Sequence, residues 1–129
     1  MKHTSFFAIA VFVAGISCNE AEKKTADIMS FIPGTYVRSF QGEYSFGHDT
    51  LFITQPDADN NFYTIRHNSS FQRVLEKKVR PIEYKSELWT AIFNNESNML
   101  LEQRKGKQIH FFPKDNSLML GTDEFKKIE

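Results

Sequence analysis

The sequence has one cysteine, little glycine or proline, and no net charge. Its 129 residues include six Gly and four Pro, and 16 basic side chains balance 16 acidic ones. A single cysteine excludes an internal disulfide and a cysteine-based zinc site. The lack of a basic excess argues against nucleic acid as a partner. Phenylalanine is abundant by contrast, with 13 copies, and a chain of this length is expected to form one domain.

Long apolar runs are also lacking. The longest run covers residues 6–14, which is far short of the ~20 residues that a membrane-spanning helix needs. Lys2 precedes this run, and the small residues Gly15 and Ser17 follow it. This order of charge, short apolar run and small residues predicts a signal peptide over residues 1–17.

Cys18 follows the predicted signal peptide, and the segment around it resembles the lipobox of bacterial lipoproteins. In that family a peptidase cleaves just before a cysteine that then carries acyl chains. Ile16 and Ser17 fit the pattern, whereas Gly15 stands where leucine is usual. The resemblance implies an acylated Cys18 that tethers the chain to a membrane, because two or more acyl chains bind firmly. Two alternatives are an ordinary secretory signal with an incidental cysteine and a retained N-terminal anchor helix.

Residues 18–30 are rich in charge and contain few large apolar side chains, which predicts a flexible tether behind the lipidated cysteine. Glu20 and Glu22 resemble the acidic surface-export signals of Bacteroidota lipoproteins, although a plain linker explains them equally well. The resemblance implies a location in the cell envelope. The chain would be lipid-anchored to the outer membrane and face either the periplasm or the cell surface.

Residues 31–129 alternate short apolar segments with turn signals every 8–12 residues, which indicates an all-β domain. The expected strands are 32–38, 50–54, 62–67, 71–75, 82–93, 99–102, 108–112, 117–120 and 125–128. The residues 68–70 are expected to form a turn. No segment shows a convincing helical stripe. An antiparallel meander of about eight such strands is expected to close into a barrel, because closure removes its edges.

The opening Gly34-Thr35-Tyr36 resembles the Gly-x-aromatic entry of lipocalin-like barrels. The order of features along the chain is similar to that of small Bacteroidota lipoproteins with a lipocalin-like domain. This resemblance implies a fold but brings no activity with it. An eight-stranded barrel has room inside for side chains or for one small ligand.

The sequence offers little support for an enzyme, a metal site or a cofactor. It contains no G-x-S-x-G motif, no Gly-rich phosphate loop and no pair of histidines at metal-ligand spacing. His67 and His110 could meet across a barrel, but nothing requires it. Asp57 and Asp59 lie in a Pro/Asn-rich segment, where turn formation explains them. We therefore predict a protein that is not an enzyme and that holds no cofactor or metal.

The segment 82–93 is the longest expected strand, and its apolar residues lie on both faces. Tyr84, Leu88 and Ile92 share one parity, and Trp89 and Phe93 share the other. Because three large apolar residues outnumber two, we expect Leu88 and Ile92 in the core. Trp89 is then expected outside or at a rim of the barrel, beside an outward Phe93, where exposed aromatic residues are typical of binding sites. Consecutive aromatic residues elsewhere, such as 62–63 and 111–112, must also point to opposite faces.

Two further segments carry possible surface chemistry. Asp49-Thr50-Leu51 resembles the acceptor for O-glycosylation in Bacteroidota periplasmic proteins, which makes Thr50 a candidate site. The basic residues 77–80, together with Arg73, could contact anionic headgroups or an acidic partner. A solvated hairpin loop would show the same composition.

The favoured function is a membrane-tethered module that binds a protein or a glycan through exposed aromatic side chains. The alternative is a carrier that holds a small apolar ligand inside the barrel. A barrel mouth lined by Tyr36, Trp89 and polar residues would favour the carrier. An interior filled by large side chains would favour the binding module.

Overall fold

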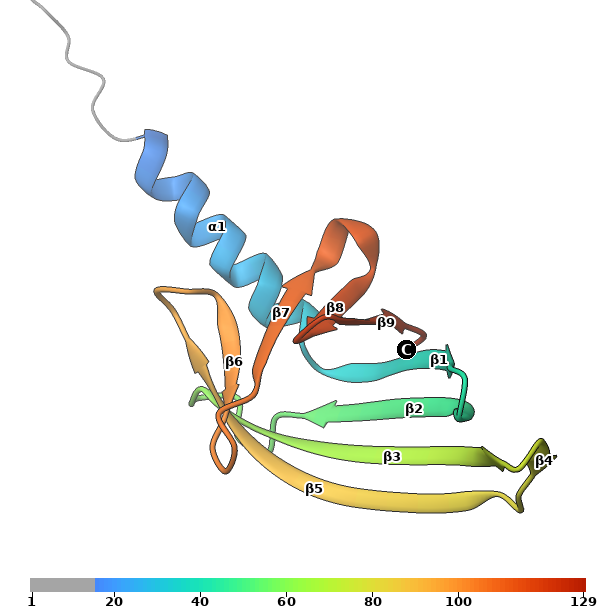
Figure 1. Ribbon diagram of the computed structural model, residues 1–129. Coiled ribbons are helices and arrows are strands. Elements are labelled where there is room, and N and C mark those ends of the chain that lie inside the picture. The colour runs from blue at the N-terminus through green and yellow to red at the C-terminus, as the bar shows by residue number, and fades with distance from the viewer. Residues whose placement is uncertain (1–15) are drawn as a thin grey trace, which may run out of the picture.

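The computed structural model describes residues 16–129, most of which lie in β-strands (Figure 1). The signal peptide predicted for residues 1–17 therefore lies almost wholly outside the described residues. The elements are, in chain order, α1 (Ile16–Phe31), β1 (Gly34–Gln41), β2 (Ser45–Thr54), β3 (Phe62–Leu75), β4 (Lys78–Val79), β5 (Glu83–Asn94), β6 (Met99–Glu102), β7 (Gln108–Phe112), the 3-10 helix η1 (Pro113–Asp115), β8 (Ser117–Leu120) and β9 (Asp123–Lys127).

Eight of these strands form a closed antiparallel barrel. The strands follow the order β2-β1-β9-β8-β7-β6-β5-β3, and an additional pairing between β2 and β3 closes the ring. β4 is an extra strand that pairs with β3. Each barrel strand thus lies beside its neighbour in sequence, which is the up-and-down arrangement that lipocalins also use. The predicted all-β barrel of about eight strands is confirmed.

The strands differ greatly in length. β3 has 14 residues and β5 has 12, whereas β6, β7, β8 and β9 have four or five each. The β3–β5 hairpin therefore projects past the short strands, with β4 at its end (Figure 1).

The turn predicted at residues 68–70 is wrong, because β3 runs through it. The side chains of this segment bond to neighbouring strands and not to their own backbone. Ser86 Oγ donates to Asn68 Oδ1 at 2.7 Å, and Ser69 Oγ donates to Asp49 Oδ1 at 2.6 Å. These cross-strand partners replace the local bonds that make Asn and Ser typical of turns.

Large side chains fill the barrel interior. The fully buried ones are Tyr36, Tyr63, Phe93, Phe125, Ile32, Leu51, Ile53, Ile65, Leu100, Ile109 and Leu118. Burial alternates along β7 and along the barrel halves of β2, β3 and β5, as a closed sheet with one dry face requires. The predicted split of consecutive aromatic residues is confirmed, since Tyr63 and Phe111 are buried while Phe62 and Phe112 are exposed.

The segment predicted as a flexible tether is helical, and its last turn is part of the core. The last turns of α1 lie against one end of the barrel, where Ile28 and Ile32 are buried, and its earlier turns extend away from the barrel (Figure 1). The Tyr36 hydroxyl lies 2.9 Å from the carbonyl oxygens of both Phe31 and Ile32. Lys127 Nζ also donates to the Phe31 carbonyl. A positive charge at the C-terminal end of a helix stabilises it, because the unpaired carbonyl groups there carry partial negative charge. Within residues 16–129 no helix is long and apolar enough to cross a membrane.

Two buried tyrosines are expected to respond in opposite ways to loss of the hydroxyl. Tyr36→Phe removes a hydrogen bond and should lower the free energy of unfolding by about 1–3 kcal/mol. The Tyr63 hydroxyl is buried without a hydrogen-bond partner among the described residues. Tyr63→Phe should therefore leave stability unchanged or raise it by about 1 kcal/mol, because an unsatisfied polar group costs free energy. Urea denaturation of the two variants checks this, and equal losses would contradict it.

Candidate functional site

The two faces of β5 are the reverse of the sequence prediction. Trp89 and Phe93, expected at the surface, are buried with 6% and 2% of their area exposed. Leu88 and Ile92, expected in the core, are 62% and 45% exposed. Trp89 and Phe93 are therefore core residues, and neither forms an exposed binding patch.

The physical reason lies in which part of β5 belongs to the barrel. The sequence predicts that Tyr84 belongs to the inward set, but it lies in the projecting half of the hairpin and is 80% exposed. Ala91, which is fully buried, belongs to the inward set with Trp89 and Phe93. Its small side chain lies between two large ones, an alternation of sizes that suits the interior of a small barrel.

The other predicted site residues lie apart from one another. Tyr36 is fully buried against the C-terminal end of α1 and does not line an open mouth. Thr50 lies in the middle of β2, pairs with Val37 and Asn68, and is half-buried. Cys18 lies in the first half of α1. Acylation of Cys18 and glycosylation of Thr50 both stay predictions.

A charged rim forms inside the barrel at the end away from α1. Its centre is Asp49, which is 7% exposed. Arg38 Nε donates to Asp49 Oδ2 at 2.8 Å, Ser69 Oγ donates to Oδ1 at 2.6 Å, and His67 Nε2 lies 3.3 Å from Oδ1. Burial acts to raise the pKa of Asp49, but Ser69, Arg38 and His67 outweigh it and hold the pKa below its ordinary value. Arg38 also lies 3.4 Å from Asp123.

Trp89 connects this rim to the hydrophobic core. Its Nε1–H donates to Glu87 Oε2 at 3.0 Å, and this bond is the main reason that the pKa of Glu87 lies below its ordinary value. The His67 ring lies 5.0 Å from the Trp89 ring between centroids. Lys107 Nζ lies 4.0 Å above the same ring, close enough for a cation–π contact. Groups on β3, β5 and the loop before β7 therefore hold one indole in place.

This arrangement does not have the geometry of a nucleophilic triad. A triad needs serine bonded to histidine and histidine bonded to aspartate, whereas here Ser69 and His67 both bond to Asp49. His67 points inward, and His110 lies between the two buried residues Ile109 and Phe111 and so points outward. The two histidines therefore do not meet. No cluster of three metal-ligating side chains occurs in the described part of the chain.

The outer face of β2, β3 and β5 carries exposed apolar side chains in matching register. We define the apolar wall as Phe52, Phe62, Leu88 and Ile92, each at least 36% exposed. Phe62 lies directly opposite Ile92, and Phe52 and Leu88 lie on either side of Arg66 in one cross-strand row. A row formed by Thr54, Thr64 and Thr90 lies between the two apolar rows. Exposed apolar side chains gathered on one face of a folded chain are typical of an interaction site.

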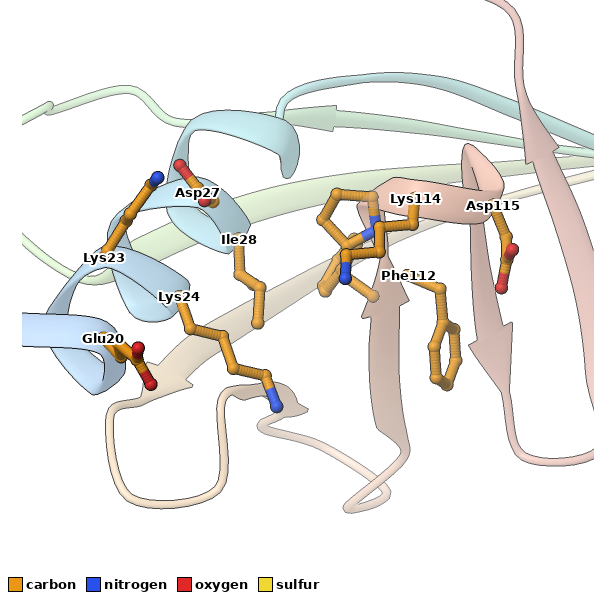
Figure 2. A pocket seen from close by; sticks show the side chains of 10 residues that line it. Glu20, Lys23, Lys24, Asp27, Ile28, Phe112, Lys114 and Asp115 are labelled. Atoms are coloured by element: carbon orange, nitrogen blue, oxygen red, sulfur yellow. The ribbon is translucent and has the colours of Figure 1, made fainter. Parts of the chain in front are cut away.

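A groove lies between α1 and the β7–η1 segment (Figure 2). Its volume is about 660 Å³, and Ile28, Phe111, Phe112 and Pro113 supply its apolar lining. The charged residues around it are Glu20, Lys23, Lys24, Asp27, Lys114 and Asp115. Three basic and three acidic side chains give this groove no preference for a ligand of either charge.

Sequence reasoning missed the charged rim and the apolar wall, although part of the signal was present. Arg38 pairs directly with Asp49 across β1 and β2, and Asp49 pairs with Ser69 across β2 and β3. Correct hairpin registers would have placed these side chains together. No family model, curated protein or solved structure matches the chain. The function of the site must therefore be argued from its geometry.

Proposed function

We propose that the chain is an extracytoplasmic lipoprotein, tethered to a membrane through acylated Cys18, whose barrel binds a partner. The lipobox-like segment around Cys18 supports the tether, and an outer-membrane location in the cell envelope follows from the same resemblance. The partner is a protein or a glycan, and the aliphatic side chains of Leu88 and Ile92 favour a protein.

The apolar wall carries this proposal. Leu88 is 62% exposed on a rigid strand, beside Arg66 on the neighbouring strand. Exposed aliphatic side chains with a central arginine match the composition of protein interfaces, where apolar contacts and Arg dominate the binding energy. The wall thus takes the place of the Trp89 and Phe93 patch that the sequence predicted.

The carrier alternative receives less support. Tyr63, Phe93 and Phe125 are fully buried inside the barrel with many aliphatic neighbours. A ligand in that space would have to displace core side chains, each of which contributes about 1.5–3 kcal/mol through burial. The open groove beside α1 lies outside the barrel and does not change this argument.

A photo-crosslinking amino acid at position 88 tests the binding proposal in cells. We expect an adduct that Ile92→Ser and Phe62→Ser remove, because both changes disrupt the apolar wall. The matched control places the crosslinker at the exposed position 124 on β9, where no adduct is expected. After digestion of the adduct, peptides of a second chain attached to the position-88 peptide identify a protein partner, and attached sugar identifies a glycan. Equal adducts at both positions, or none at either, would count against the proposal.

Cys18→Ala tests the tether separately. Cys18 is the only cysteine and so the only thiol available for acylation. We expect the variant to move from the membrane fraction to the soluble fraction and to incorporate no labelled palmitate. A wild-type chain that is soluble and unlabelled would overturn the tether while leaving the binding proposal open to the crosslinking test.

A further inference from the structure

The tip of the β3–β5 hairpin combines basic and exposed apolar side chains. We define the hairpin tip as residues 73–84. It carries four basic side chains (Arg73, Lys77, Lys78 and Arg80) against two acidic ones (Glu76 and Glu83) in a chain with no net charge overall. Arg73 is paired with Glu83 at 3.0 Å, which leaves the excess positive charge near the turn.

Exposed apolar side chains lie among these charges. Among the described residues, the exposed large apolar side chains at this end of the molecule are Tyr44, Leu75, Val79, Ile82 and Tyr84. Val79 is 58% exposed and Ile82 is 51% exposed. Exposing such a group of apolar side chains to water is unfavourable in free energy, so they are candidates for contact with another surface.

The hairpin tip is also held by backbone hydrogen bonds and projects from the molecule. The Val74 N–H donates to the Tyr44 carbonyl at 2.8 Å, and the Arg80 N–H donates to the Arg73 carbonyl at 2.8 Å. The tip lies beyond the short barrel strands and at the opposite end of the molecule from the start of α1 (Figure 1). It can therefore reach a flat surface before the rest of the barrel does.

The turn itself places charge where local geometry favours other residues. Leu75 pairs with Lys78, which leaves Glu76 and Lys77 as a two-residue turn with φ values of 54° and 63°. Asn and Gly adopt such left-handed positions with the least strain. The chain holds two charged residues there instead, and such local exceptions are typical of functional positions.

We propose that the hairpin tip docks on an anionic bilayer surface. Lysine side chains near such a surface are attracted to its headgroups, and aliphatic and tyrosine side chains favour the interface beneath them. An acidic protein would attract the basic side chains of the tip, but this attraction would not by itself explain why Val79 and Ile82 are exposed at a convex tip. This contact is distinct from the tether at Cys18 and from the apolar wall, and it depends on neither.

An environment-sensitive dye tests the proposal on the full chain. Cys18→Ser removes the only native thiol, and Ile82→Cys then places a single label at the hairpin tip. With vesicles of phosphatidylcholine containing phosphatidylglycerol, we expect the dye emission to shift to shorter wavelength. Vesicles of phosphatidylcholine alone should leave it unchanged. The matched control is Glu124→Cys in the same background, an exposed position on β9 outside both the hairpin tip and the apolar wall, which should show no shift.

Removing the positive charges of the turn is a second test of the proposal. Lys77→Gln with Lys78→Gln should weaken vesicle binding measured at position 82 by about fivefold for each lysine, and added salt should weaken the binding of the parent chain. No shift at position 82, equal shifts at positions 82 and 124, or no effect of the two lysines would overturn the proposal. A shift induced by polyglutamate and not by vesicles would also overturn it, in favour of an acidic protein partner.

Discussion

Replacing Trp89 with alanine is expected to lower the free energy of unfolding by about 3–5 kcal/mol. The indole is 6% exposed and contacts both the His67 ring and Lys107 Nζ. Its removal leaves a cavity and also breaks the bond to Glu87. Leu88→Ala, at the adjacent and 62% exposed position, should cost at most about 0.5 kcal/mol.

Chemical denaturation followed by circular dichroism measures both changes without relying on the indole. Fluorescence of the wild-type chain gives an independent measurement, because Trp89 is the only tryptophan. We expect emission at short wavelength and little quenching by iodide, as for a buried indole. An iodide-quenched Trp89, or a Leu88→Ala loss as large as that of Trp89→Ala, would contradict the orientation of β5.

The strands were predictable because their signals are local. The residues 99–102, 108–112 and 117–120 were expected as strands and match β6, β7 and β8. Each of these segments ends at a clear turn signal, and alternation between two neighbours needs no knowledge of the rest of the chain. The same local rule placed one member of each consecutive aromatic pair outside.

The inward face of β5 could not be predicted from the local sequence. Both parities of this strand carry large apolar residues, so counting them does not identify the inward set. What decides is where the ring closes, since Trp89 pairs with Ile65 within the barrel while Tyr84 pairs with Ser70 in the projecting hairpin. The sequence did not predict the helix α1 for a related reason. Its buried Ile28 lies in the last turns, and the earlier turns carry charges without an apolar stripe.

The charged rim shows a third limit. Sequence reasoning treated Asp49 only as part of a glycosylation motif, because its partners Arg38 and His67 lie on other strands. The two hairpin registers bring all three to one place inside the barrel. Polar residues that face a barrel interior break the apolar alternation, and this break is the signal that would have identified them.

Asp49→Ala is expected to lower the free energy of unfolding by about 3 kcal/mol. Removing one partner of a buried ion pair leaves the other charge uncompensated, at a cost of about 3–5 kcal/mol. The lower end applies here because Arg38 is partly exposed and can still reach Asp123. Glu124→Ala is the matched control, since its pair with Lys126 at 2.8 Å is about half exposed on both sides. That change should cost less than about 1 kcal/mol.

Acid should reduce the contribution of Asp49 to the free energy of unfolding. The folded chain holds the pKa of Asp49 below its ordinary value, so the ionised carboxylate is bound more favourably in the folded state. Its contribution is present above the unfolded-state pKa of about 3.9 and is lost as the pH falls through the folded-state pKa. The stability difference between the wild-type chain and Asp49→Asn should therefore shrink between about pH 5 and about pH 2. Glu102, whose pKa is also lowered because three backbone N–H groups outweigh its burial, is present in both chains and cancels in this difference. A difference that stays constant or grows in acid would mean that Arg38, Ser69 and His67 do not favour the charged form of Asp49.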